Sequence, residues 1–223
     1  KAKVRAHALS TLSKLVTGDP AQITPAEKEK LESVFKNALA DRSYSVIGEA
    51  LTGIARLNPA KAIETAKPFE NEDNENIVLA VARIYGDMGT REQSDFFRKK
   101  INGLNDFKKT SIIQEYAAYL MNQDDETINR GLPILEDFTR TESSWWRRLK
   151  GLELIDQIYD EYDERQFETE QKMKTSSKQS PDFGKLQQDL QMIKSQKEKI
   201  NTLIASITKD EKDNRVLLFF KND

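Results

Sequence analysis

The residues of this chain that could perform acid–base or metal chemistry are few, and their spacing does not suit either. The single histidine is His7, and there is no cysteine. A zinc site of the HExxH type needs two histidines four residues apart on one helix face, and a Ser-His-Asp arrangement would need a GxSxG turn as well. Neither pattern occurs. We therefore interpret His7 as an ordinary surface or interface residue, and we predict no catalytic residue, metal ligand or cofactor in residues 1–223.

A group of carboxylates lies in the sequence DQIYDEYDER at residues 156–165. It lacks the glycine and the ligand spacing of an EF-hand loop. We interpret it as a solvated helix face, with Ile155, Ile158, Tyr159 and Tyr162 turned inward. The phosphate-binding sequences GxxxxGK(S/T) and GxGxxG are also missing, so nucleotide binding is not indicated.

The candidate binding residues are Trp145, Trp146, Arg147 and Arg148, at the expected start of a helix. Successive helical residues point about 100° apart, so only one of the two tryptophans is expected to be fully buried. One interpretation is a core tryptophan beside a partly exposed one. The alternative is that the exposed tryptophan and an arginine form an interface with another domain, where both residue types are enriched. The four residues are therefore candidate domain-interface residues.

The charge and hydropathy of the chain restrict its partners. Its 35 basic and 37 acidic residues give a net charge of -2. They do not create the positive field that phosphate backbones require, so we expect no nucleic-acid partner. No stretch approaches the roughly 18 to 20 continuous apolar residues of a membrane span, and the start lacks a signal-peptide pattern. We expect a soluble chain, and the absence of cysteine leaves its compartment open.

The composition favours long amphipathic helices, with 32% charged and 37% apolar residues but only 9 glycines and 6 prolines. The segment DRSYSVIGEALTGIARLNP at 41–59 shows the 3.6-residue period clearly: Asp41 or Ser43 can cap it, and Asn58-Pro59 ends it and starts the next helix. The expected helices lie near 2–16, 25–40, 42–57, 59–69, 74–87, 90–102, 106–122, 125–139, 143–164, 183–208 and 211–220. The predicted fold class is all-α.

The first expected helix repeats this segment at a distance of 42 residues. The shift aligns Val4 with Val46, Ala8 with Ala50, Leu9 with Leu51, Leu12 with Ile54 and Leu15 with Leu57. Weaker matches follow near residues 81 and 152, and the small residues Ala8, Ala50, Ala80 and Gly151 are expected where facing helices approach closely. Recurrence at roughly 30 to 45 residues predicts a HEAT/armadillo-like α-α superhelix, because each hairpin buries its apolar face only by stacking on its neighbours.

Three regions are expected along the chain. Residues 1–163 form the helical repeats, residues 164–182 form a polar helix extension and loop, and residues 183–223 form a long and a short helix. Heptad spacing in the long helix involves Leu186, Leu190, Ile193, Ile200, Ile204 and Ile207. This spacing fits a coiled coil between chains, but with about three heptads we favour a helix that closes the end of the solenoid.

The segment at 41–59 resembles a helix in the C-terminal HEAT-like domain of M1-family aminopeptidases, the gluzincin zinc exopeptidases, especially bacterial ones. The matching residues are Asp41, Ser43, Tyr44, Val46, Ala50 and Leu51, with KVRAHAL as the preceding repeat. The resemblance covers residues 1 to about 160. In that family the catalytic and substrate-anchoring motifs, HExxHx18E and GxMEN, belong to other domains, and neither occurs here.

The resemblance implies a non-catalytic module that packs on the catalytic domain of the same polypeptide, covers its active-site chamber and restricts the access of peptide substrates. Zinc would belong to the catalytic domain of that parent enzyme, and no catalytic or zinc-binding residue carries over to this chain. The chain enters an amphipathic pattern at Lys1 without an initiator methionine, which we interpret as the C-terminal part of a larger protein. The alternative is a HEAT-type scaffold that binds a partner protein or peptide on its concave face.

Overall fold

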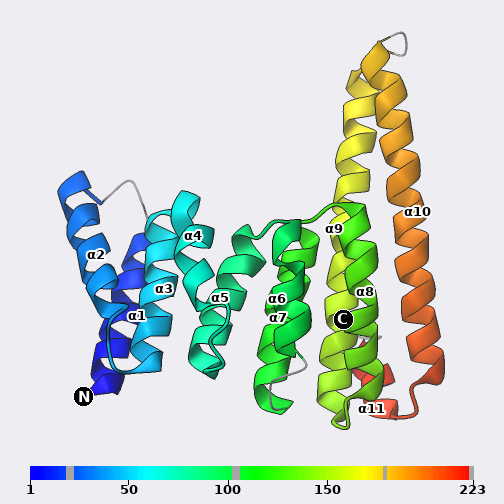
Figure 1. The fold of residues 1–223 in the computed structure, drawn as a ribbon. Coiled ribbons are helices and arrows are strands. Elements are labelled where there is room, and N and C mark those ends of the chain that lie inside the picture. Colours follow the sequence, from blue (N-terminus) through cyan, green and yellow to red (C-terminus); the bar gives the residue numbers. More distant parts are fainter. Residues whose placement is uncertain (19–22, 102–105, 178–179, 221–223) are drawn as a thin grey trace. The chain divides into compact units, whose positions relative to one another are not determined.

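Every regular element that the structure describes is a helix, which confirms the all-α prediction (Figure 1). The structure is a computed structural model that describes residues 1–18, 23–101, 106–177 and 180–220. The α-helices are α1 (Ala2–Gly18), α2 (Pro25–Ala38), α3 (Tyr44–Leu57), α4 (Ala62–Ala66), α5 (Glu75–Met88), α6 (Ser94–Ile101), α7 (Asp106–Met121), α8 (Asp125–Thr141), α9 (Trp145–Thr175), α10 (Pro181–Asp210) and α11 (Asn214–Phe220). Short 3₁₀ helices are η2 (Pro59–Lys61), η3 (Lys67–Phe69) and η4 (Arg91–Gln93).

Helix α9 continues beyond the expected range of 143–164 to Thr175, so residues 164–175 are helical, as expected of a polar helix extension. Its polar second half is held by pairs four residues apart, such as Arg165 with Glu161 and Lys172 with Glu168, which stabilise exposed helix. The sequence also predicts turns or loops at TGDP (17–20), NGLND (102–106) and SSKQSPD (176–182), and these segments lie partly outside the described residues.

Contacts between the helices divide the chain into two compact units, residues 1–122 and residues 123–223. The first unit contains α1 to α7 and the second contains α8 to α11. The boundaries expected after residues 163 and 182 lie inside α9 and α10. Each unit is described by itself below.

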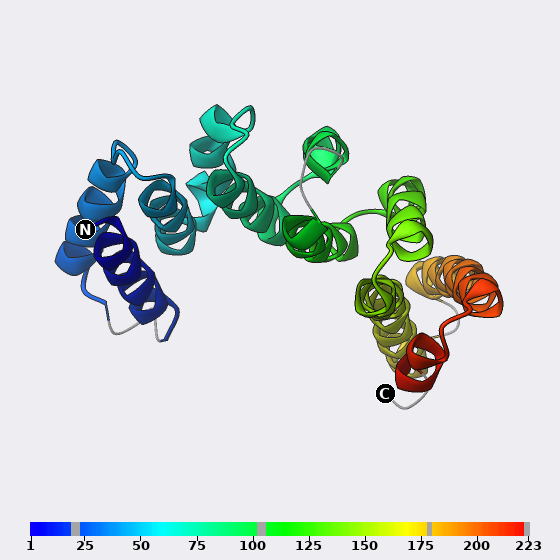
Figure 2. The ribbon, with the colours of Figure 1, turned by 90° about the horizontal axis from the view of Figure 1, so that it is seen from below.

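In the first unit, alternate helices pack on one another: α1 on α3, α3 on α5, and α5 on α7. Figure 2 shows α3, α5 and α7 following one another in this order. Helix α2 packs on α3, α4 packs on α3 and α5, and α6 packs on α7. The start of α2 is fixed by a capping box between Thr24 and Glu27, and Asn74 caps α5.

Helix α3 is the most enclosed helix of this unit, since ten of its 14 residues are buried. Two glycines let its neighbours approach. A Cβ atom at Gly48 would lie 2.9 Å from the carbonyl oxygen of Asn76, and one at Gly53 would overlap the ring of Phe35 on α2. Arg56 also donates a 2.8 Å hydrogen bond to Ser13 on α1. Helix α3 is therefore covered by α1 and α2 on one side and by α5 on another.

The prediction that small residues lie where helices approach closely is correct at three positions and wrong at one. Ala50 and Ala80 are buried, and Gly151 lies against Thr139, so the prediction is confirmed at these positions. It is wrong for Ala8, whose side chain is exposed because no described helix covers that side of α1.

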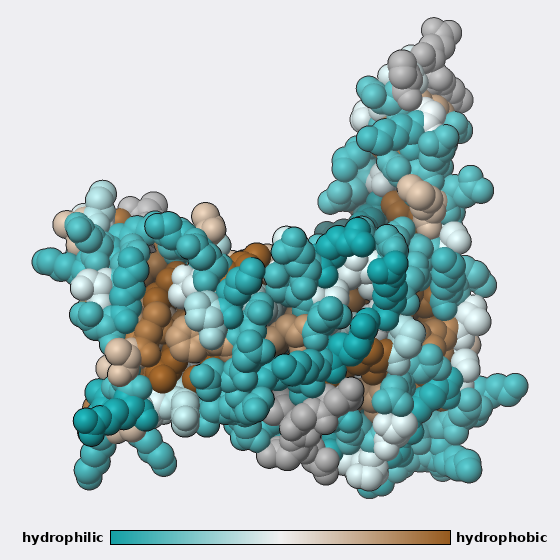
Figure 3. Space-filling model, viewed as in Figure 1, coloured by the Kyte–Doolittle hydropathy of each residue, from teal (hydrophilic) through white to brown (hydrophobic). Residues whose placement is uncertain are grey.

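In the second unit, α9 packs against α8, α10 and α11. Helices α9 and α10 run side by side and extend beyond α8, and the surface of this projecting part is mainly hydrophilic (Figures 1 and 3). The heptad residues Ile200 and Ile207 of α10 are buried. Within this chain, α10 therefore uses its apolar side for packing on α9.

Replacing Gly53 with alanine tests the contact between α3 and α2. Overpacking a tight core contact costs about 1–3 kcal/mol, and this exceeds the better helix propensity of alanine, worth about 1 kcal/mol. We expect Gly53→Ala to lower the free energy of unfolding, measured by urea denaturation followed by circular dichroism.

Gly184→Ala is the matched control, because nothing lies within 4 Å of a Cβ atom placed at Gly184 in α10. It is expected to raise the free energy of unfolding by about 0.5–1 kcal/mol. A Gly53→Ala protein as stabilised as Gly184→Ala would contradict the tight contact with Phe35.

Candidate functional site

The candidate residues Trp145 to Arg148 form the first turn of α9. Ser144 precedes them in extended backbone, and its side chain makes no capping hydrogen bond. Because neighbouring residues on a helix point in different directions, the four side chains meet different parts of the second unit.

Trp145 packs against α11. Its indole stacks on Phe219, with ring centroids 5.8 Å apart and planes tilted by 22°. The guanidinium of Arg215 lies 4.8 Å from the centroid of the same indole, which is a cation–π distance. Trp145 thus joins α9 to α11.

Trp146 is the more exposed tryptophan, with 40% of its surface accessible. The expectation of one fully buried tryptophan is wrong: Trp145 is only partly buried, because a helix of seven residues covers it. The guanidinium of Arg147 lies 5.3 Å from the centroid of Trp146, and Arg147 donates a 2.8 Å hydrogen bond to Glu142. Trp146 is the most exposed of the four candidate residues.

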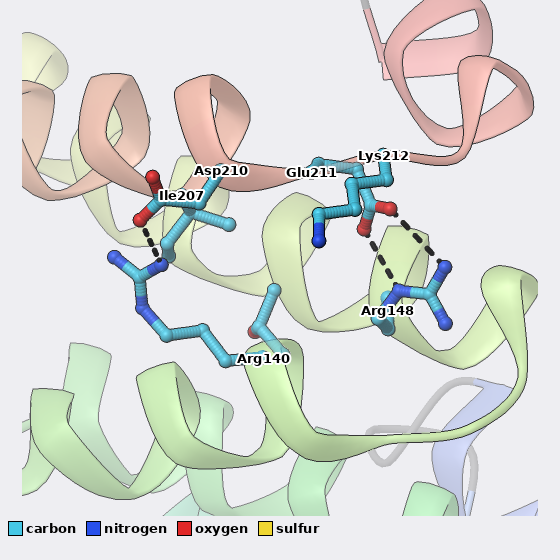
Figure 4. Close-up of a pocket in the computed structure, with 7 residues that line it drawn as sticks. Arg140, Arg148, Ile207, Asp210, Glu211 and Lys212 are labelled. Atoms are coloured by element: carbon cyan, nitrogen blue, oxygen red, sulfur yellow. Dashed lines mark hydrogen bonds and ion pairs between the residues drawn. The ribbon is translucent and has the colours of Figure 1, made fainter.

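Arg148 connects three segments of the second unit, and Figure 4 shows its bonds to Glu211. Its Nε and Nη2 atoms donate to the two carboxylate oxygens of Glu211, at 2.8 and 3.1 Å. Its Nη1 atom donates to the carbonyl oxygens of Glu142 and Ser143, at 3.0 and 3.2 Å. The hydrogen bonds from Arg148 hold the pKa of Glu211 below its ordinary value. A guanidinium paired in this way holds its partner segments in a defined geometry. Arg148 therefore has a structural role within the second unit.

The turn between α10 and α11 is fixed by the same carboxylate. The backbone N–H of Asp213 donates to Glu211 at 2.8 Å. Arg215 in turn donates to both carboxylate oxygens of Asp213, at 3.0 and 2.7 Å. These bonds lower the pKa of Asp213 to about 2. The cation that covers Trp145 is therefore itself held in place.

A hollow of 270 Å³ lies beside this cluster (Figure 4). Its lining is Thr139, Arg140, Arg148, Ile207, Asp210, Glu211 and Lys212. Arg140 donates to Glu136 and Asp210, each at 2.9 Å. Both arginines of the lining are bound by carboxylates of the same unit, so the charges of Arg140 and Arg148 are paired.

Among the remaining polar candidates, Asp160, Asp163 and Glu164 are exposed, and Asp156 and Glu161 are partly buried. His7 is exposed on α1. Ile155, Ile158 and Tyr162 are buried as predicted, while Tyr159 is only partly buried. Over the described residues, no three histidine, cysteine or acidic side chains are close enough to hold a metal ion.

A buried aromatic cluster in the first unit was not predicted from the sequence. It consists of Tyr85, Phe96, Phe97, Tyr116 and Tyr119, with neighbouring ring centroids 5.0 to 6.1 Å apart. The nearby Lys100 is buried as well, and its ammonium donates to the carbonyl oxygen of Glu72 and to Asp73. The aromatic residues at spacings of one and three were the available signal. The cluster packs α5, α6 and α7 together.

No known protein family, curated protein or solved structure matches this chain. In the part of the chain that the structure describes, no helix combines the length and the apolar character needed to cross a membrane.

Replacing Glu211 with glutamine tests the connection between α9 and the turn before α11. Hydrogen bonds to charged groups contribute about 1.5–3 kcal/mol, so we expect Glu211→Gln to lower the free energy of unfolding by that amount at neutral pH. A carboxyl whose pKa is lower in the folded than in the unfolded chain loses its stabilising effect as the pH falls through the folded value. The difference between the two proteins should therefore shrink below pH 4.5, the ordinary pKa of glutamate.

Asp210→Asn is the control, because the side chain of Asp210 is 64% exposed in its ion pair with Arg140. Its cost should stay below about 1 kcal/mol. Urea denaturation at several pH values measures the free energy of unfolding of both variants. An equal decrease in the two variants would contradict the role of Glu211 in connecting α9 to the turn before α11.

Proposed function

We propose that residues 1–223 are a non-catalytic, HEAT/armadillo-like helical module, equivalent to the C-terminal domain of an M1-type zinc aminopeptidase. In this proposal the module packs on the catalytic domain of the same polypeptide, covers its active-site chamber and restricts which peptides enter. The 42-residue repeat between α1 and α3 is the observation that carries the proposal.

The packing of the first unit supports a superhelix of repeats. Helices α1, α3, α5 and α7 pack in sequence order, and α2, α4 and α6 connect and flank them. Gly48 and Gly86 occupy similar places: a Cβ atom at either would lie 2.9 Å from a carbonyl oxygen of the next helix of the series. A stack of this kind provides an extended surface rather than an enclosed site.

Zinc and catalysis would come from the catalytic domain, because residues 1–223 contain neither HExxH nor GxMEN. The ionised side chains of the candidate cluster support a structural role, since Arg148 and Glu211 bind each other. The exposed Trp146, with Arg147 against its ring, is our candidate for contact with the catalytic domain.

A second candidate function is a scaffold that binds a partner protein or peptide along one face. A hollow of 170 Å³ between α3 and α5 favours it. The lining is Ser45, Gly48, Glu49, Thr52, Asn76, Leu79, Ala80 and Arg83. The hydroxyl, amide and charged groups of this lining offer hydrogen-bond partners to a peptide.

The two candidates differ in what the longer polypeptide contains. An HExxH sequence about two hundred or more residues before Lys1 is expected for the aminopeptidase, and its absence would favour the scaffold. The longer polypeptide should bind one zinc ion and hydrolyse aminoacyl anilides, because it would include the catalytic domain.

We expect residues 1–223 alone neither to bind zinc stoichiometrically nor to hydrolyse aminoacyl anilides. Metal content by mass spectrometry and release of the anilide chromophore measure both properties. Tight stoichiometric zinc together with anilide hydrolysis by residues 1–223 would overturn the proposal.

A further inference from the structure

Helix α1 exposes a row of apolar and small side chains that no described residue covers. Val4, Ala8, Thr11 and Leu15 follow one another at spacings of four, three and four, so they share one face of the helix. We call this row the outer stripe. Val4 is 67% exposed and Leu15 is 65% exposed. Leu9 and Val16, which point to another side of α1, are buried in the core.

The same row is covered in the next repeat. The 42-residue shift places the outer stripe on Val46, Ala50, Gly53 and Leu57 of α3. All four are buried, and three of them belong to one core cluster with residues of α1 and α2. The remaining one, Gly53, lies directly against the ring of Phe35 on α2. On α3, this row is the surface on which the preceding helical hairpin packs.

The charges beside the outer stripe indicate the chemistry of its occupant. Helix α1 has no acidic residue. Lys3, His7 and Lys14 are spaced four and seven residues apart, so they lie on one side of α1, along a border of the outer stripe. All three side chains are exposed. A second copy of α1 would bring like charges together, whereas a helix with Asp or Glu beside its aliphatic row would bring opposite charges together.

We propose that the outer stripe is the docking surface for an amphipathic helical hairpin with an aliphatic row and acidic borders. This hairpin would pack on the outer stripe of α1 in the way that α1 and α2 pack on the equivalent row of α3. The hairpin is supplied by the same polypeptide, and this part rests on the proposed function, in which residues 1–223 belong to a longer chain.

Thiol labelling tests this docking surface, because residues 1–223 contain no cysteine. Leu15→Cys is made in residues 1–223 and in the longer polypeptide, and its rate of reaction with a maleimide is followed by peptide mass spectrometry. The thiol should react on the order of tenfold or more slowly in the longer polypeptide, because a covered side chain reacts only after local opening.

Phe167→Cys is the matched control, since Phe167 on α9 is 63% exposed, nearly as much as Leu15. It should react at the same rate in both proteins. Unchanged reaction at position 15, or equal slowing at both positions, would overturn the proposal. Adding Lys3→Glu and Lys14→Glu should restore fast labelling at position 15, and failure to do so would overturn the acidic character of the hairpin.

Zinc content and anilide hydrolysis of the unsubstituted longer polypeptide are measured alongside. Protection at position 15 without zinc or hydrolysis rejects the aminopeptidase and keeps the docking surface. Zinc and hydrolysis without protection reject the docking surface and keep the aminopeptidase.

Discussion

Close approach of neighbouring helices at glycine is the constraint on which both units depend. In the first unit Gly48 and Gly86 lie against backbone carbonyl oxygens of the next helix in the series. In the second, Gly151 of α9 lies against Thr139 of α8. A larger side chain at such a point would separate the helices and weaken the contacts of the large residues on either side of it. Leu51 and Ile155, on the helices that carry Gly48 and Gly151, are both fully buried.

Most helices could be predicted from the sequence, because the residues that start, end and orient a helix lie within it or next to it. Asn58-Pro59 ends α3 and starts the next turn of helix, and the apolar period of 41–59 gives the buried side of α3. The repeat of 42 residues also predicted which residues of α1 are equivalent to those of α3. It did not predict their burial, because burial depends on a neighbour and not on the helix itself.

The surroundings of the candidate site could be predicted only in part. Its tryptophans and arginines were identified by type, but their partners Glu211, Arg215 and Phe219 lie more than sixty residues further along the chain. The periodicity of a single sequence indicates which residues share a face of one helix, and it does not indicate which distant residues contact that face. The expectation of a core tryptophan failed for this reason, since a short C-terminal helix and an arginine cover Trp145 instead of the aliphatic core.

The order in which the helices of the first unit pack has a consequence for how that unit folds. Helices α1, α3, α5 and α7 each contact the next of the series, so their packed residues lie one helical hairpin apart along the chain. Closing short loops costs little entropy, and proteins rich in such local contacts fold quickly. We therefore expect the outermost helices of the unit to open at a lower free energy than its centre.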